Sequence, residues 1–126
     1  MRAVDTNVLV RLLTRDDDKQ VASAEAFAAK GVWVSHLVVA ETAWVLRAVY
    51  DFERDDIAQA LDMLLQNHRV TIQDREVLEA ALVHYRQRQA VGFSDCLLLE
   101  IARKAGHLPL GTFDKALSRL EDVERL

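Results

Sequence analysis

The stretch "MRAVDTNVLV" at residues 1–10 places a carboxylate, Asp5, between two apolar runs. Ala3 and Val4 before it indicate the end of a short buried strand, and residues 8–13 have the spacing of the first turns of a helix. A strand that leads directly into a helix is typical of α/β folds, whose ligands bind beyond the carboxyl ends of parallel strands. Asp5 therefore occupies a position at which a ligand site is expected.

Short strand patterns and helical patterns alternate along the rest of the chain. Further strands are predicted at residues 32–34, 70–72, 108–111 and 123–126. Helices are predicted at residues 16–30, 35–50, 54–67, 94–105 and 114–120, and between Asp74 and Gly92. We therefore predict an α/β fold, a three-layer α/β/α sandwich with a mostly parallel central sheet of four to five strands. A helical hairpin is expected at about 36–67, and a single domain over residues 1–126.

The composition limits the classes of function. The chain has 126 residues, of which 51% are hydrophobic, and a formal net charge of −4. It can bury a sizeable core and has no general basic coat for nucleic acid, although a local basic patch is compatible with it. Cys96 is the only cysteine, which excludes a disulfide framework and favours a buried thiol in a reducing cytoplasm. With no signal-peptide pattern and no apolar run of membrane-spanning length, we expect a cytoplasmic protein with no membrane association.

Three further acids, Glu41, Asp95 and Asp114, lie among apolar residues at helical spacing. Glu41 has Leu37, Val38, Trp44 and Val45 at these spacings, Asp95 has Val91, Leu98 and Leu99, and Asp114 has Leu110 and Leu117. These faces are expected to be buried, where a lone carboxylate costs several kcal/mol or becomes protonated. Together with Asp5, the acids are best explained if they converge on a cation. An oxygen-only donor set favours Mg²⁺ or Mn²⁺.

Each acid also has a structural alternative. Asp5 could cap the helix that follows it, and Asp95 and Asp114 could be charges at helix N-termini. Glu41 has no such role because it lies in mid-helix, and Arg47 is six residues away, the wrong spacing for a helical ion pair. Taken together, the four acids favour a metal site over four separate structural roles.

Several basic residues near these acids could contact a nucleic-acid backbone, although a solvated helix surface is the simpler explanation for any one of them. They are Arg11, Arg15, Arg47, Arg103, Lys104 and Lys115.

Other site classes are disfavoured. A haloacid-dehalogenase-like phosphatase needs a second aspartate where this chain has Asn7, and a receiver domain needs an acidic pair at a strand end. The chain has no G-x-S-x-G elbow and no glycine-rich turn, which disfavours a serine hydrolase and a nucleotide binder of the P-loop or Rossmann kind.

Four stretches of the chain resemble the PIN-domain ribonucleases, and among these the VapC toxins of bacterial toxin–antitoxin pairs most closely. They are "VDTNVLVRLL" at 4–13, "SHLVVAETAWVL" at 35–46, "FSDCLLLEIARKAG" at 93–106 and "LGTFDKAL" at 110–117. The resemblance covers nearly the whole chain, with the motifs in the family's order. One departure follows Asp95, where the family is rich in alanine and this chain has Cys96 and three leucines. We interpret this change as a repacked core helix.

The resemblance implies roles for individual residues. Asp5, Asp95 and Asp114 match metal ligands of the family, and Glu41 matches an acid that either binds the metal or orients the attacking water. Asn7 and Thr112 match polar groups that orient the acids, while Thr6 and Ser94 are adjacent positions with less defined roles. The cofactor implied is Mg²⁺ or Mn²⁺.

The implied function is that of a metal-dependent endoribonuclease, the toxin of a VapBC toxin–antitoxin pair, which hydrolyses RNA phosphodiester bonds. The implied partners are an RNA substrate, a VapB-like antitoxin and a second copy of the chain. For such a homodimer the helical hairpin offers apolar residues, namely Val39, Ala43, Leu46, Tyr50 and Phe52. The alternatives are a housekeeping PIN nuclease in RNA maturation and a non-catalytic PIN-fold RNA-binding module.

Overall fold

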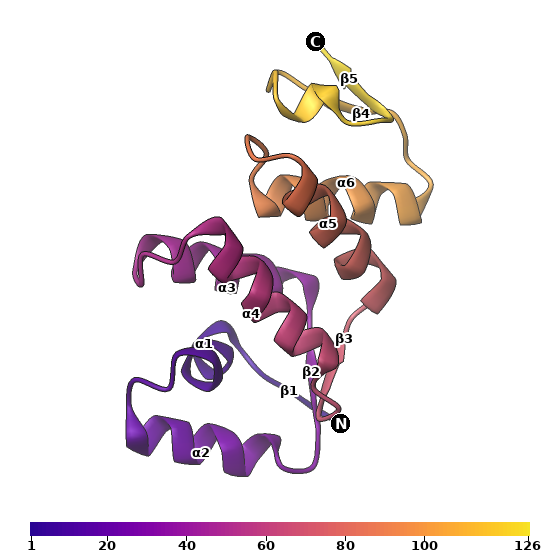
Figure 1. Cartoon of the computed structure of the whole chain (residues 1–126). Helices are drawn as coiled ribbons and strands as arrows, with labels where there is room; N and C mark the ends of the chain where they lie inside the picture. The colour runs from indigo at the N-terminus through magenta and orange to yellow at the C-terminus, as the bar shows by residue number, and fades with distance from the viewer. The chain divides into compact units, whose positions relative to one another are not determined.

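Strands and helices alternate along the chain in the computed structural model, which describes residues 1–126 (Figure 1). The strands are β1 (Arg2–Ala3), β2 (Val32–Val34), β3 (Val70–Ile72), β4 (Leu110–Thr112) and β5 (Val123–Arg125). The α-helices are α1 (Thr6–Thr14), α2 (Asp18–Ala28), α3 (His36–Ala48), α4 (Arg54–Gln66), α5 (Arg75–Gln87) and α6 (Phe93–Ala105). All strand pairs are parallel, so the predicted α/β class is confirmed.

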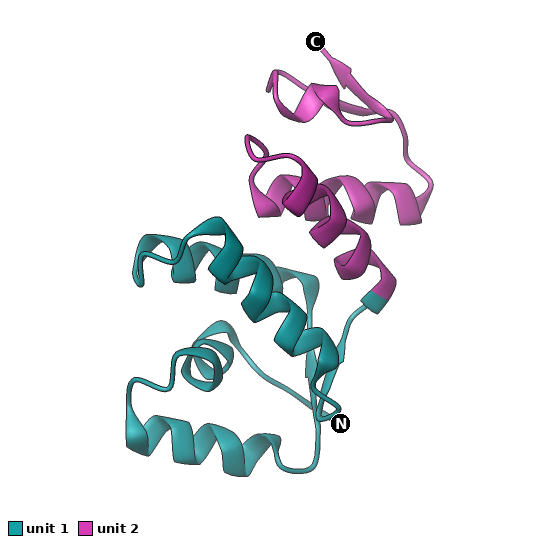
Figure 2. Cartoon of the chain, viewed as in Figure 1, with its two compact units in different colours: residues 1–75 teal, residues 76–126 magenta.

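The first of two compact units comprises Met1–Arg75 (Figure 2). Its sheet has the strand order β1-β2-β3, with Val32 of β2 opposite Arg2 on one side and Val70 on the other. Helices α1 and α2 connect β1 to β2, and α3 and α4 connect β2 to β3, as the alternating pattern predicted. Helix α1 packs against both α2 and α3. The core of this unit includes the fully buried side chains of Leu9, Val32, Val34, Val39, Leu46 and Leu61.

The second unit comprises Glu76–Leu126 and contains most of α5, α6 and a sheet in which β4 pairs with β5. Leu78 of α5 and Leu97 and Leu99 of α6 are buried in its core. The rings of Tyr85 and Phe93 meet edge to face with their centroids 5.6 Å apart, which fixes the start of α6 against the end of α5. The expected parallel strands are all present, and hydrogen bonds join them as one sheet of three and one of two.

Local side chains set the helix boundaries. Asp17 and Ser35 accept hydrogen bonds from the backbone N–H groups of Gln20 and Val38, so each caps the helix that follows it. Gly106 ends α6 with a φ of 85°, a left-handed conformation that glycine adopts without strain. The predicted hairpin at 36–67 is confirmed as α3 and α4.

Two predicted boundaries near the C-terminus are wrong. The strand expected at 108–111 begins at Leu110 instead. The helix expected at 114–120 is only a 3₁₀ turn at Leu117–Arg119. Asp114 accepts a hydrogen bond from the Leu117 N–H as a helix cap does, but Leu120 is already extended, with φ −78° and ψ 151°, so the turn ends before a regular helix forms. No helix of the structure has both the length and the apolar character needed to cross a membrane.

Candidate active site

Asp5 lies at the start of α1 in the first unit. Its Oδ1 accepts a hydrogen bond from the Val8 N–H at 3.1 Å, so Asp5 is the N-cap of this helix. The capping role that the sequence offered as an alternative for Asp5 is therefore confirmed. The cap uses only Oδ1, so the Oδ2 atom takes no part in it. The side chain is exposed, in contrast to the burial that the surrounding apolar run had suggested.

Glu41 of α3 meets the same end of α1. Its Oε2 accepts a 2.6 Å hydrogen bond from the Thr6 hydroxyl, and Thr6 follows Asp5 directly. This contact explains why an acid stands in the middle of α3. Glu41 and Thr6, the residue that orients it, are 35 positions apart in the chain. Asn7, which was expected to orient an acid, makes no side-chain hydrogen bond to one here, whereas its neighbour Thr6 does.

The face of α3 that carries Glu41 is exposed, so the prediction of its burial is wrong. Leu37 and Trp44, one helical turn to either side of Glu41, are 67% and 68% exposed. The face that α3 buries is the stripe Val39, Thr42, Ala43 and Leu46. Val39, Ala43 and Leu46 therefore belong to the core and are not the dimer surface that the sequence had suggested. Helix α3 is apolar on most sides, and periodicity alone did not identify its buried face.

Asp95 and Asp114 form a second pair within the second unit. Asp95 lies in the first turn of α6 and is partly buried. Burial raises the pKa of the Asp95 carboxyl, and the negative charge of Asp114 raises it further. The two carboxylates are therefore close enough to repel each other.

Hydrogen bonds hold the segment around Asp114. Its backbone N–H donates to the Thr112 hydroxyl at 3.0 Å, and its Oδ1 accepts from the Leu117 N–H at 3.0 Å. The Thr112 backbone is fixed in turn, since its carbonyl accepts from the Leu126 N–H at 2.8 Å. Asp114 itself is exposed, contrary to the sequence prediction, and its Oδ2 takes no part in the turn.

The chemistry of these side chains fits a hard divalent cation. All the donors are carboxylate or hydroxyl oxygens, and no cysteine or histidine is among them. The repulsion between Asp95 and Asp114 is the kind that a bound cation relieves. Each unit contributes two of the four acids, and no group of three or more acidic, histidine or cysteine side chains is gathered for a metal within the structure.

A groove of about 510 Å³ lies beside Asp5, between α1 and α2. Its walls are Asp5, Asn7, Val8, Arg11, Lys19, Gln20, Ser23, Ala24 and Phe27. The Arg2 guanidinium covers the ring of Phe27 at 3.8 Å from its centroid. The groove thus combines an apolar wall with a carboxylate at one end.

Most of the basic residues near the acids are already paired with carboxylates. The pairs are Arg11 with Asp16, Arg15 with Glu25, Arg47 with Glu53, Arg103 with Glu100 and Asp122, and Lys104 with Glu76. Lys115 forms no such pair. Each of these residues except Lys115 therefore has an ion-pair partner within the chain.

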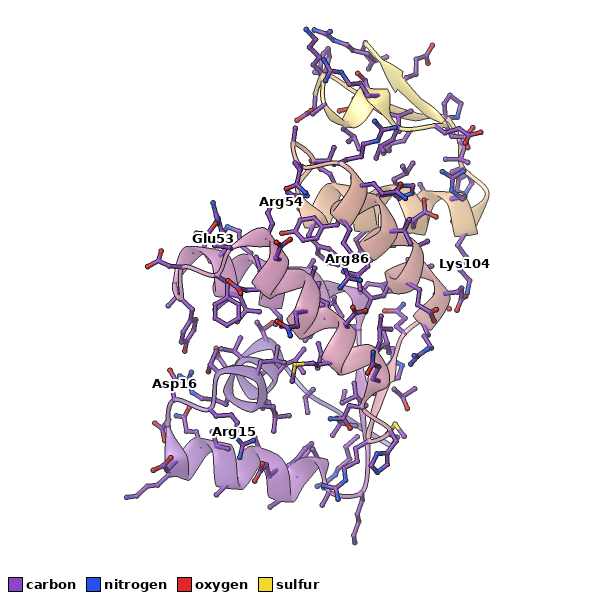
Figure 3. The ribbon with its side chains drawn as sticks, in the orientation of Figure 1. Arg15, Asp16, Glu53, Arg54, Arg86 and Lys104 are labelled. Atoms are coloured by element: carbon purple, nitrogen blue, oxygen red, sulfur yellow. The ribbon has the colours of Figure 1, made fainter.

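Sequence reasoning missed a polar cluster around Arg11. The guanidinium donates to Asp16, to Gln20 and to the Tyr50 hydroxyl, and Tyr50 in turn donates to Asp16 at 2.8 Å. The Tyr50 hydrogen bond lowers the pKa of the Asp16 carboxyl below its usual value. Asp16, which is labelled in Figure 3, thus ties the α1–α2 loop to Tyr50, just after the end of α3. The sequence carries no local signal for it because Tyr50 lies 39 positions from Arg11.

A second missed cluster surrounds Glu100, a buried acid of α6. Its Oε2 lies 3.1 Å from the His84 Nε2 and 3.1 Å from the Arg103 Nε. Arg103 also donates to Asp122, next to β5. The cluster joins α5, α6 and the C-terminal segment, so we assign it a structural role. The apolar helical spacing of α6 gave reason to notice Asp95 but not this neighbouring acid.

The fold agrees with the comparisons with known proteins. The PIN domain family matches residues 2–123, a range that runs across both units. The chain therefore belongs to the PIN domain family. A VapC ribonuclease of Aquifex aeolicus (strain VF5) is 28% identical to it over 126 residues, which cover 95% of this chain and 92% of that protein. No solved structure is significantly similar to the chain.

Proposed function

We propose that this protein is a metal-dependent endoribonuclease of the VapC type, the toxin of a VapBC pair, acting in the cytoplasm. Membership of the PIN domain family and similarity to a VapC ribonuclease support this proposal. The observation that carries it is the closeness of Asp95 and Asp114, whose charges repel each other in a way that a bound cation would relieve. Asp5, Asp95 and Asp114 would hold Mg²⁺ or Mn²⁺, with Glu41 as a further ligand or as the residue that orients water. Both units would then form one PIN domain over residues 1–126.

A divalent ion bound by these acids would lower the pKa of a bound water and offset the negative charge of the RNA phosphate. The chain's own groups prepare this chemistry. Thr6 holds the Oε2 of Glu41 and leaves Oε1 able to accept a proton from the attacking water. The caps made by Asp5 and Asp114 use one oxygen each, which fixes both carboxylates while the other oxygen stays available.

The direct test is cleavage of a fluorescently labelled single-stranded RNA by the purified full chain. We expect cleavage with Mg²⁺ or Mn²⁺ and none with EDTA. Under the same conditions the melting temperature should rise with metal, because an ion at 100 times its Kd stabilises the folded state by about 2.7 kcal/mol. Cleavage that continues unchanged in EDTA would contradict the metal-dependent mechanism. A melting temperature that responds to metal without any cleavage would favour the non-catalytic RNA-binding module.

An antitoxin partner is also proposed. The groove beside Asp5 supports it, because an amphipathic segment could place apolar side chains on Val8, Ala24 and Phe27 and a cation near Asp5. Co-expression with a small protein encoded next to this gene should inhibit RNA cleavage and relieve growth arrest. If such a protein copurifies with the chain but leaves cleavage unchanged, this inhibitory mechanism is wrong. If expression causes no growth arrest, the housekeeping nuclease becomes the better assignment.

A homodimer is proposed on the family resemblance. In the helical hairpin, Val49 and Met63 are exposed apolar residues that could contribute to such an interface, in place of the buried residues first considered. Sedimentation at micromolar concentration is expected to give a dimer. A monomer under these conditions would exclude it.

A further inference from the structure

The two most exposed aromatic side chains of the protein both lie next to a proposed active-site acid. The chain has four Phe, two Trp and two Tyr residues. Phe113 is 80% exposed and directly precedes Asp114, and Trp44 is 68% exposed and lies one helical turn after Glu41. An exposed aromatic ring gains nothing from the hydrophobic effect in the folded chain, so its position suggests a contact with another molecule.

Phe113 is presented by a rigid turn. The hydrogen bond from the Asp114 N–H to the Thr112 hydroxyl spans this residue, and the bond from the Leu117 N–H to Asp114 fixes the chain that follows. On the other side, the Thr112 carbonyl is bonded to the β5 end of the sheet through Leu126. A ring whose backbone is already ordered loses little conformational entropy when it binds a ligand.

An unpaired positive charge also lies in this segment. Lys115 is exposed and forms no ion pair, unlike the other basic residues near the acids. An aromatic ring, a carboxylate and an unpaired cation thus follow one another at residues 113–115. The combination of an aromatic platform with a cation is typical of surfaces that bind single-stranded nucleic acid, whose bases stack and whose phosphates attract lysine.

We propose that Phe113 stacks on an unpaired base of the RNA next to the cleaved phosphodiester, while Lys115 contacts a neighbouring phosphate. This inference rests on the proposed ribonuclease function and names its substrate class as single-stranded RNA or an RNA loop with an unstacked base. A base inside a regular duplex has both faces covered by its neighbours and cannot offer one to Phe113. Trp44 is a candidate for a second stacking position beside Glu41, by the same reasoning.

The test compares steady-state cleavage by four full-length proteins: the parent, Phe113→Leu, Phe113→Trp and Val83→Ala. Leucine keeps an apolar side chain but removes the ring, tryptophan keeps a ring, and Val83 is an exposed apolar residue of α5 that serves as the control. The probe is a 5′-fluorescein single-stranded RNA, used intact and with one abasic nucleotide at each position around the mapped cleavage site. A fully paired version of the same RNA is the second comparison.

We expect Phe113→Leu to lower kcat/KM by about 10-fold on the intact RNA, the loss typical of one stacked base. Phe113→Trp and Val83→Ala should cleave it like the parent. At one position the abasic RNA should lower kcat/KM for the parent by a similar factor and have no further effect on Phe113→Leu. The paired RNA should be a poor substrate for all four proteins.

Three results would overturn the inference. The first is cleavage by Phe113→Leu at the parent's rate. The second is a Phe113→Leu defect that the abasic RNA deepens just as it does for the parent. The third is a lower melting temperature for both Phe113 variants, which would make the ring a packing residue. If the Phe113→Leu variant cleaves normally but loses a protein partner, the ring is a protein contact. If the parent cleaves no RNA, the proposed function itself fails.

Discussion

The two carboxylate pairs, Asp5 with Glu41 and Asp95 with Asp114, differ in their exposure to solvent and in their electrostatic environment. In the first unit, Asp5 and Glu41 are exposed and each accepts a hydrogen bond, from the Val8 N–H and the Thr6 hydroxyl. In the second unit, burial and the charge of Asp114 act against ionisation of Asp95. The first pair is oriented by hydrogen bonds on an exposed surface, whereas the second pair joins the partly buried Asp95 to the exposed, hydrogen-bonded Asp114 and carries electrostatic repulsion.

This difference has a physical meaning for a metal site. Hydrogen bonds orient a ligand, while repulsion between two acids is an unfavourable interaction that a bound cation relieves. We therefore expect the first pair to determine the direction of the ligands and the second pair to contribute more to metal affinity.

The largest expected effect is on cleavage. Asp5→Asn, Glu41→Gln, Asp95→Asn and Asp114→Asn should each lower metal-dependent kcat/KM by about 10³-fold, or roughly 4 kcal/mol of activation free energy. Each change keeps the shape of the side chain and removes one negative charge from the proposed cation site. Steady-state cleavage of a labelled RNA measures the loss.

Asp55→Asn is the matched control for these variants. Asp55 is an exposed acid in the first turn of α4 and is not one of the four candidate acids, so its replacement should leave kcat/KM within about two-fold of the parent. If either Asp5→Asn or Asp95→Asn cleaves RNA at the parent's rate, the pair that contains this acid is not part of the metal site. The comparison between the two pairs then no longer applies.

A smaller effect is expected when the hydrogen bond to Glu41 is removed. Thr6→Val keeps the size of the side chain and deletes the donor, so Glu41 loses its fixed orientation. We expect about a 10-fold lower kcat or metal affinity, the range for an outer partner of a metal ligand. Asn7→Ala, which removes a neighbouring side chain that holds no acid, should have little effect. Equal losses in the two variants would show that Thr6 has no special role.

The capping role of Asp5 can be separated from its proposed role in catalysis. Asp5→Ala should lower the free energy of unfolding by about 1 kcal/mol, because α1 loses its N-cap. Asp5→Asn should keep most of this stability because asparagine caps equally well, while cleavage is lost in both variants. Chemical denaturation in EDTA gives the two free energies. If Asp5→Asn is as unstable as Asp5→Ala, the acid's charge and not its cap supports the helix.

The smallest expected effect is a pH dependence of stability that arises from Asp95. The pKa of Asp95 in the folded protein lies above its ordinary value of 3.8, so the folded state disfavours the charged form. The resulting destabilisation is absent below that value and grows as the pH rises through the folded pKa. Asp95→Asn should therefore become more stable than the parent as the pH rises, in the absence of metal.

Denaturation of both proteins in EDTA at several pH values between about 3.5 and 7 measures this difference. The same series with Glu41→Gln serves as the comparison from the first unit. If the stability difference between the parent and Asp95→Asn stays constant with pH, the folded protein does not disfavour the charged form of Asp95, and the proposed repulsion is wrong.

Much of the fold could be predicted from the sequence because its signals are local. The β-branched run Val32–Val34 becomes β2, Ser35 caps α3, and Gly106 ends α6, all within a few residues of their cause. The helix expected after Asp114 is only a 3₁₀ turn because Leu120 is already extended and the chain soon enters β5. The pairing of β5 with β4 sets this early stop, and a local pattern of apolar residues does not reveal it.

The candidate site was predicted only in part. The four acids were noticed because they interrupt apolar patterns, yet Asp5, Glu41 and Asp114 are exposed, so the premise of burial holds only for Asp95. The hydrogen bond from Thr6 to Glu41 could not be predicted from a local sequence pattern, because the two residues are 35 positions apart. Tertiary partners of this kind decide which side chain is oriented, and they follow from helix packing.

The buried thiol of Cys96 can be used to measure local opening of α6. Its side chain is fully buried in α6, one residue after Asp95, and it is the only cysteine of the chain. A thiol reagent such as iodoacetamide can reach it only when α6 opens, so the alkylation rate reports the free energy of that opening. Mg²⁺ or Mn²⁺ held by Asp95 would slow alkylation, and metal binding could be followed without attaching a label or altering any residue.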